Sequence, residues 1–153
     1  MSNVGLTTTE LLSYIPQQKP FRFVDEIISI NNEKIVGAYT FKQDEFFYAG
    51  HFPNNTITPG VILLEAMAQI GVVAFGIYLF SLEVPRNELN KRIAVLTDAH
   101  IEVIKPVFPE TRVIISAEKV FWRRMKMKSN VEMHDEQGNL LATAVVSGIG
   151  VSK

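Results

Sequence analysis

The sequence contains a histidine and a glutamate at positions where one could accept a proton from a substrate and the other could donate one. His51 lies in the segment Gly50-His51-Phe52-Pro53, and Glu65 follows fourteen residues later, inside an apolar run that starts at Gly60. Histidine titrates near neutral pH, and an apolar environment keeps a carboxyl group protonated at a higher pH than usual. This pair predicts general acid–base catalysis with no cofactor.

The start of the same apolar run supplies a third chemical element. The N–H groups of a helix's first turn, here those of Gly60 and Val61, have no partner within the helix and can hold a developing oxyanion. Gly60 has no Cβ, so a ligand can approach its backbone closely. Glu65 lies five residues further on, about 7.5 Å along the helix axis. The sequence therefore predicts a base in the loop, an oxyanion holder at the helix start and an acid deeper in.

Each of these residues could also have a purely structural role. A lone loop histidine such as His51 is more often a hydrogen-bonded structural residue, whereas a carboxylate among apolar residues must be paired, neutralised or functional. Gln69 could simply be the hydrogen-bond partner of Glu65. The histidines His51, His100 and His134 are not at metal-ligand spacing, and His-Glu-x-x-His, phosphate-loop and Gly-x-Ser-x-Gly motifs are missing from the sequence. We therefore expect no metal site.

Several elements must position these residues. Asn31-Asn32 separates two apolar runs as a hairpin turn would, and Thr58 and Pro59 suit the N-cap and the first position of a long helix. The expected elements are a helix over Thr7–Ile15 with Thr7 and Glu10 as a capping box, strands Phe21–Ile30 and Ile35–Phe41, a loop over Glu45–Thr58, the long helix to about Phe80, and strands Ile93–Lys105, Thr111–Trp122, Met125–His134 and Leu140–Val151. This order predicts an α+β fold in which one helix packs on an antiparallel sheet, as a single domain over residues 1–153.

The composition is that of an ordinary globular protein. Of 153 residues 47% are hydrophobic, and the net charge of −1 gives no general attraction to nucleic acid. Without cysteine the chain has no disulfides, and its N-terminus shows no signal peptide, so we expect a cytoplasmic protein. The run Gly60–Phe80 is long enough to span a membrane. Glu65 and Gln69 share one of its faces, which favours the central helix of a soluble domain instead.

Three motifs give the sequence a specific resemblance. Gly50-His51-Phe52-Pro53, Pro59-Gly60-Val61 and Glu65-Ala66-Met67-Ala68-Gln69 resemble the signature of the bacterial 3-hydroxyacyl-[acyl-carrier-protein] dehydratases. The flanking segments Pro20-Phe21…Val24-Asp25 and Lys105-Pro106-Val107-Phe108-Pro109 are similar to that family as well. The resemblance covers about Ile15–Gly148 and implies the hot-dog fold, a long helix wrapped by an antiparallel sheet, in a homodimer whose sheets join.

The resemblance also implies roles for the residues. His51 removes the C2 proton of a 3-hydroxyacyl thioester, Glu65 of the second subunit helps the hydroxyl leave as water, and the Gly60 amide polarises the thioester carbonyl. The substrate arrives on the phosphopantetheine of an acyl carrier protein. The expected substrate-binding residues are Gly60, Val61, Leu64, Ala68 and Gln69, with Val61, Leu64 and Ala68 lining an acyl tunnel.

Four basic residues crowd one strand end, where a carrier protein could dock. They are Arg123, Arg124, Lys126 and Lys128, with Met125 and Met127 alternating between them as inward positions would. A merely solvated edge protected by lysines is equally compatible with the pattern.

The sequence also departs from the family pattern. Asn54-Asn55-Thr56 replaces its Gly-x-Pro, Gln17 stands where many members carry histidine, and Glu102 stands near a usually basic position. The departures leave the catalytic pair intact and are compatible with a specialised dehydratase. Two alternatives remain open, a hot-dog thioesterase and a non-catalytic acyl-binding module.

Overall fold

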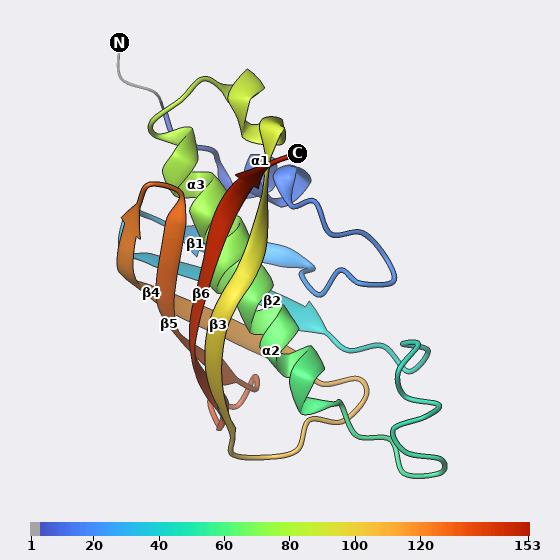
Figure 1. Cartoon of the computed structure of the whole chain (residues 1–153). Helices are drawn as coiled ribbons and strands as arrows, with labels where there is room; N and C mark the ends of the chain where they lie inside the picture. The colour runs from blue at the N-terminus through green and yellow to red at the C-terminus, as the bar shows by residue number, and fades with distance from the viewer. Residues whose placement is uncertain (1–3) are drawn as a thin grey trace.

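An antiparallel sheet of six strands curls around one long helix in the computed structural model, which describes residues 4–153 (Figure 1). The strand order is β1-β2-β4-β5-β6-β3, so the last strand along the chain lies next to the third. The strands are β1 Glu26–Ile30, β2 Lys34–Thr40, β3 Arg92–Val103, β4 Arg112–Arg123, β5 Lys126–His134 and β6 Leu140–Ser152. This architecture confirms the predicted α+β fold with a helix wrapped by a sheet.

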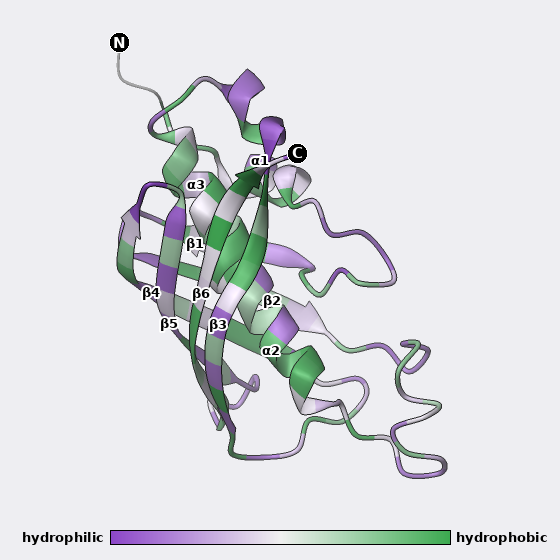
Figure 2. Cartoon of the chain, in the orientation of Figure 1, coloured by the Kyte–Doolittle hydropathy of each residue, from purple (hydrophilic) through white to green (hydrophobic). Residues whose placement is uncertain are grey.

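The central helix runs from Gly60 to Ser81 in three parts, α2 Gly60–Ala68, a π-helical segment η1 Gln69–Ala74, and α3 Phe75–Ser81. It passes the length and hydropathy test for a membrane span, but 72% of its most apolar window is buried inside the fold. Figure 2 shows that its mostly hydrophobic surface lies within the curl of the sheet. The helix is apolar on most sides because the sheet surrounds it.

The π-helical segment is a feature that the hydrophobic pattern did not predict. At its centre, Gly71 lies so close to β5 that a Cβ atom there would sit 2.8 Å from Val131 Cγ2. The Ser129 hydroxyl, also on β5, donates a hydrogen bond of 2.5 Å to the Gly71 carbonyl. Contact with the sheet thus satisfies a carbonyl in a stretch where the regular α-helical bonding is interrupted.

The short N-terminal helix α1 Thr8–Tyr14 has the predicted capping box, in which Thr7 and Glu10 exchange side-chain to backbone hydrogen bonds. It is followed by an extended segment to β1. A short 3₁₀ helix, η2 Arg86–Lys91, connects α3 to β3.

Two predicted boundaries differ from the structure for an identifiable physical reason, and the other predicted ends lie within two residues of the observed ones. The long helix begins one residue late, with Pro59 as N-cap, because the Thr58 hydroxyl bonds to the Tyr48 hydroxyl instead of the helix start. The first strand begins at Glu26 rather than Phe21. Residues 21–23 bond to a side chain of the central helix, and this contact replaces a strand partner there.

Strand β3 forms one edge of the sheet, where it pairs with β6 alone among the described strands. Its twelve residues are largely exposed, including the apolar side chains of Val95 and Leu96, which are 45% and 51% exposed. Charged residues such as Asp98 and Glu102 are exposed on the same strand, so the edge is only partly apolar. It offers both unpaired backbone groups and apolar area to another strand.

Candidate active site

The segment between β2 and α2 holds His51 and projects away from the sheet, past the start of the central helix (Figure 1). The His51 N–H donates to the Tyr48 carbonyl at 3.3 Å, and the Ile57 N–H donates to the His51 carbonyl at 3.1 Å. The ring atom Nδ1 lies 2.8 Å from the Ile57 carbonyl oxygen. A carbonyl can only accept, so Nδ1 carries a proton in this bond, and in the neutral ring the lone pair is then on Nε2, as a general base requires.

A buried pair of hydroxyls anchors this loop, and it was not predicted. The hydroxyl oxygens of Tyr48 and Thr58 lie 2.6 Å apart, and the Thr58 N–H donates to the Val107 carbonyl at 2.8 Å. Burial raises the pKa of Tyr48, so its hydroxyl stays protonated and available as a donor. The anchor joins both ends of the His51 segment to the fold.

The Asn54 backbone confirms that the family's glycine is not needed for this turn. Its φ of 62° lies in the left-handed region, which asparagine tolerates better than most residues. The turn closes through reciprocal backbone hydrogen bonds of 2.8 Å between Phe52 and Asn55.

Glu65 lies on α2, half-buried, with Gln69 one turn further along. The Gln69 amide nitrogen donates to Glu65 Oε2 at 2.8 Å and to the Phe21 carbonyl at 2.9 Å, while its oxygen accepts from the Phe23 N–H at 2.8 Å. Burial raises the pKa of Glu65, and the hydrogen bond from Gln69 opposes that shift in part. The carboxyl group is therefore oriented and biased towards its protonated form, as an acid catalyst should be.

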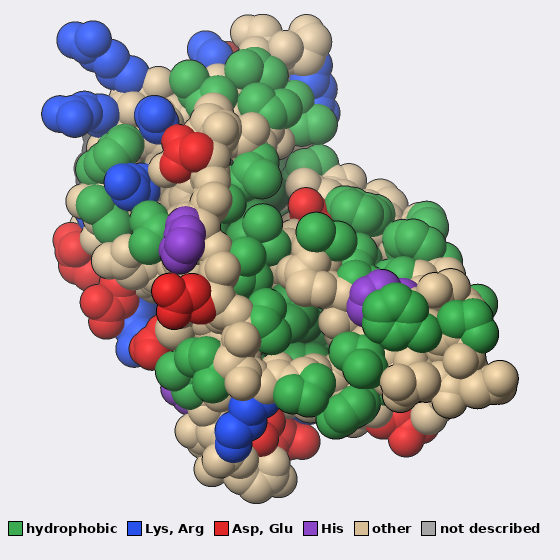
Figure 3. All heavy atoms as spheres, turned by 60° about the horizontal axis from the view of Figure 1, so that its bottom comes forward, with side chains coloured by type: hydrophobic (Ala, Val, Ile, Leu, Met, Phe, Trp, Pro, Cys, Tyr) green, Lys and Arg blue, Asp and Glu red, His purple; other side chains and the backbone are tan. Residues whose placement is uncertain are grey.

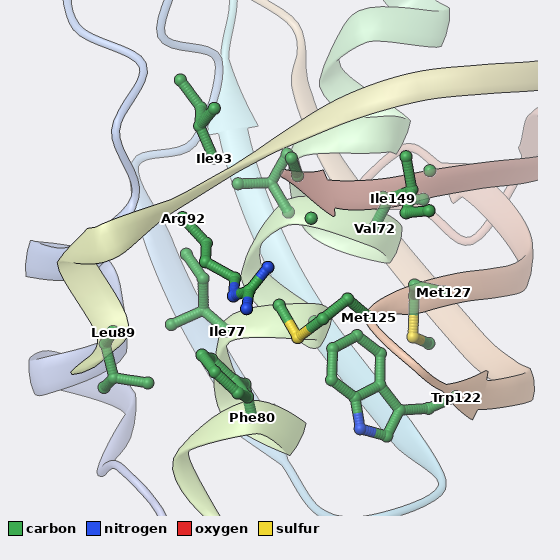
Figure 4. A pocket seen from close by; sticks show the side chains of 15 residues that line it. Val72, Ile77, Phe80, Leu89, Arg92, Ile93, Trp122, Met125, Met127 and Ile149 are labelled. Carbon is green, nitrogen blue, oxygen red and sulfur yellow. The ribbon is translucent and has the colours of Figure 1, made fainter. Parts of the chain in front are cut away.

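Beside Glu65 lies a cavity of about 80 Å³, and residues of β3 form one of its walls. It is lined by Gln17, Glu65, Ala68, Val72, Val73, Ala94, Val95 and Leu96. Further along the helix is a second cavity of about 40 Å³, mostly apolar, which Figure 4 shows between the central helix, β3 and the β4–β5 turn. The two cavities share the wall residues Val72, Val73 and Ala94. Two neighbouring cavities with largely apolar walls thus lie along the helix, and the first of them contains the carboxyl group.

The predicted substrate-binding residues fall in different places. Ala68 lines the Glu65 cavity, whereas Val61 is 74% exposed and, like the half-buried Leu64, lies outside that cavity. Gln69 is fully buried, and its amide is engaged by Glu65 and the backbone. Its contact with substrate stays a prediction, while the structure gives it a supporting role.

The helix start has the free donors that an oxyanion site needs. Within the described residues, no hydrogen bond uses the N–H of Gly60 or Val61, whereas the next two N–H groups both donate to the Pro59 carbonyl. Gly60 is exposed, so a ligand can reach this turn.

His51 and Glu65 do not meet within one chain. All hydrogen bonds of His51 in the described structure stay inside its own loop, and His51 does not line the Glu65 cavity. Glu65 instead shares its cavity with Ala94, Val95 and Leu96 of β3. Sequence alone left open whether one chain holds both groups.

The four basic residues lie around the β4–β5 turn. Arg123 ends β4, Lys126 begins β5 and Lys128 follows on it, while Arg124 and Met125 form a tight turn with φ of 51° and 65°. In residues 4–153 none of the four basic side chains forms an ion pair. Two methionines point inward, since Met127 is buried and Met125 lines the second cavity.

Comparison with known proteins identifies the family. A model of the FabA-like domain matches residues 15–145. The 3-hydroxyacyl-[acyl-carrier-protein] dehydratase FabZ of Syntrophobacter fumaroxidans is 30% identical over 144 residues, covering 94% of both chains. The FabZ of Geotalea uraniireducens is 34% identical over 117 residues, covering 75% of this chain and 77% of the relative.

Solved structures show the same fold at low sequence identity. The dehydratase heterocomplex ApeI:P from Xenorhabdus doucetiae aligns with a TM-score of 0.76 at 14% identity, covering 97% of this chain and 93% of that one. A thioesterase from Haemophilus influenzae aligns with a TM-score of 0.67 at 14% identity, covering 99% and 94%. The fold alone is therefore shared by dehydratases and thioesterases. The match over residues 15–145 and the FabZ relatives decide between them, and the chain belongs to the FabA-like family of hot-dog proteins.

Proposed function

We propose that this protein dehydrates a 3-hydroxyacyl thioester, carried on the phosphopantetheine of an acyl carrier protein, to the trans-2-enoyl thioester. The observation that carries the proposal is the carboxyl group of Glu65, biased towards its protonated form beside an apolar cavity, in a chain related to FabZ dehydratases. The reaction needs no redox partner, because the elements of water leave from adjacent carbons. No cofactor is required beyond the substrate's own carrier arm.

The proposed steps balance with these residues. Nε2 of His51 takes the C2 proton, and the C2–H electron pair becomes the C2=C3 double bond. The C3–O bond breaks while Glu65 gives its proton to the departing oxygen, which leaves as water. The Gly60 N–H hydrogen-bonds to the thioester oxygen, where negative charge develops as C2 loses its proton.

A homodimer would bring His51 of one subunit to Glu65 of the other. Three features support this arrangement. His51 makes its hydrogen bonds inside its own loop, the Glu65 cavity has a wall of β3 residues, and β3 pairs on one side alone among the described strands, with exposed and partly apolar side chains. Figure 3 shows hydrophobic side chains spread over the face in view between the sheet and the projecting loop. Two β3 strands meeting across a two-fold axis would cover both edges at once.

The acyl chain is proposed to follow the apolar space beside the helix, past Ala68 towards the second cavity. The carrier protein is proposed to dock on the basic β4–β5 turn, since its unpaired charges suit an acidic partner. We also propose a cytoplasmic location, where a carrier-linked pathway would supply the substrate.

One assay tests the proposal. The purified protein is mixed with crotonyl and longer trans-2-enoyl thioesters, and hydration is followed by loss of enoyl absorbance. We expect hydration by the wild type and a loss of about 10²–10⁴-fold in each of His51→Ala and Glu65→Gln. Free acid without hydration would identify a thioesterase, and binding without turnover would identify an acyl-binding module. Either result would reject the dehydratase.

A further inference from the structure

One buried side-chain polar atom in the described residues has no hydrogen-bond partner, and it belongs to the wall of the Glu65 cavity. This atom is Oε1 of Gln17, in the segment that follows α1. A buried acceptor left unpaired is unfavourable, so folded proteins rarely keep one without a use. The position of Gln17 indicates what that use is.

The cavity contains only two polar side chains. Six of its eight lining residues are apolar, namely Ala68, Val72, Val73, Ala94, Val95 and Leu96, and the other two are Gln17 and Glu65. A small apolar cavity with a few polar groups is the usual design of a ligand site, where those groups fix orientation. Here the two polar groups differ in kind. Glu65 in its protonated form donates, and Gln17 Oε1 accepts.

A hydroxyl group is the ligand chemistry that matches both, because its oxygen accepts one hydrogen bond and its proton donates another. We propose that Gln17 is a further substrate-contacting residue, whose Oε1 accepts the hydrogen bond of the substrate's 3-hydroxyl group while Glu65 protonates the same oxygen. This inference rests on the proposed dehydratase function and adds a residue that its acid–base pair does not include.

The contact suits the bond-breaking step. The 3-hydroxyl oxygen keeps its own hydrogen, held on Gln17, gains the proton of Glu65 and leaves C3 with the electrons of the C3–O bond. The product is water with one hydrogen from each source. Gln17 exchanges no proton in this step. A neutral amide oxygen is therefore sufficient to accept the hydrogen bond, and no acidic or basic side chain is needed at this position. The contact also distinguishes a 3-hydroxyacyl chain from a saturated chain of the same length.

The test measures this discrimination directly in a variant whose turnover is slowed by about 10²–10⁴-fold. In the His51→Ala background, which keeps Gln17 and Glu65, calorimetry gives the dissociation constants of 3-hydroxybutyryl-pantetheine and butyryl-pantetheine. We expect the hydroxylated ligand to bind about tenfold more tightly, as one satisfied hydrogen bond to a pre-placed acceptor provides. Adding Gln17→Met, which keeps the length of the side chain but removes the acceptor, should bring this ratio close to one.

The adjacent glutamine provides a matched control. Gln18 is exposed, and its amide bonds only to the carbonyls of Ile15 and Pro16 in its own turn. Gln18→Met in the same background should therefore keep the tenfold ratio. With His51 restored, Gln17→Met should lower kcat for dehydration about tenfold, whereas Gln18→Met should not.

Three results would overturn the assignment. They are an unchanged ligand ratio in Gln17→Met, an equal fall of that ratio in Gln18→Met, and a loss of folded protein in Gln17→Met. The last result counts because an unpaired acceptor contributes nothing to stability, so its removal should leave the melting temperature unchanged or higher. Wild-type hydration of crotonyl thioester is measured in parallel. If the wild type does not hydrate crotonyl thioester, the dehydratase function itself is rejected. If it does, and the ratio of the two dissociation constants is unchanged in Gln17→Met, only the role of Gln17 is rejected.

Discussion

Replacing Gln69 by methionine should disturb the fold and the acid together, because one buried amide serves both. The Phe23 N–H would lose its only acceptor in a fully buried place, which costs about 1–3 kcal/mol. Phe21 is 43% exposed, so water can partly replace the hydrogen bond that its carbonyl accepts from Gln69. The free energy of unfolding should therefore fall by about 2–4 kcal/mol in total. At about 2–4 °C per kcal/mol for a chain of this size, the melting temperature should fall by roughly 5–15 °C.

The activity of Gln69→Met should change in a way that simple destabilisation does not produce. Glu65 would lose the hydrogen bond that lowers its pKa, leaving burial, which raises it, unopposed. The alkaline limb of the kcat profile, where the acid loses its proton, should therefore move to higher pH. Below that limb kcat should be lower, because the carboxyl group is no longer held in place.

Ile70→Val is the matched control, since this neighbouring residue is also fully buried and makes no side-chain hydrogen bond. It should cost about 1 kcal/mol and leave the pH profile unchanged. Both variants are compared by thermal unfolding at one fixed protein concentration, because subunit association contributes to apparent stability. If Gln69→Met unfolded at the temperature of Ile70→Val and kept the wild-type pH profile, the supporting role of Gln69 would be refuted.

Four further variants test separate parts of the proposal. At a pH above the ordinary pKa range of glutamate, Glu65→Gln should be more stable than the wild type, because burial disfavours the ionised carboxylate. This gain in the free energy of unfolding should vanish as pH falls below that range. A gain of the same size at every pH, measured by urea titration, would contradict the prediction. Refolding inactive His51→Ala together with inactive Glu65→Gln should restore roughly a quarter of wild-type activity, because half of randomly mixed dimers are mixed and each has one intact site; inactivity with mixed dimers present would reject the shared site. Charge reversal at Arg123 and Arg124 should raise KM for carrier-bound substrate only, and equal kinetics for small thioesters would dispose of the docking surface. Ala68→Phe should shorten the preferred acyl chain, whereas equal losses on short and long substrates would indicate damaged packing.

Features with a local cause could be read from the sequence. The capping box needs only Thr7 and Glu10, three residues apart, and the structure has it. The Asn31-Asn32 turn and the later strands also follow from local turn residues and alternation. The family resemblance, carried by short motifs, led to the hot-dog fold in the same way.

Features that depend on contacts between residues far apart in the sequence could not be predicted from it. Thr58 looked like a helix cap, but the hydroxyl that engages it belongs to Tyr48, ten residues earlier. Phe21 looked like part of a strand, but its partner is the side chain of Gln69, 48 residues later. No local pattern encodes such a pairing, so the anchor of the His51 loop and the support of Glu65 became visible only when the fold brought these residues together.

Trp122 gives the protein a built-in optical reporter. It is the single tryptophan of the chain, it lines the second cavity beside the central helix (Figure 4), and its indole N–H donates to Glu83 at 2.6 Å. Indole emission responds to the polarity around the ring, and no second tryptophan dilutes the signal. When an acyl chain fills that cavity, the surroundings of the ring become more apolar and the emission should shift to shorter wavelength. Arrival of the chain's far end can then be timed in a stopped-flow fluorimeter without any label, separately from the chemistry at the carboxyl group.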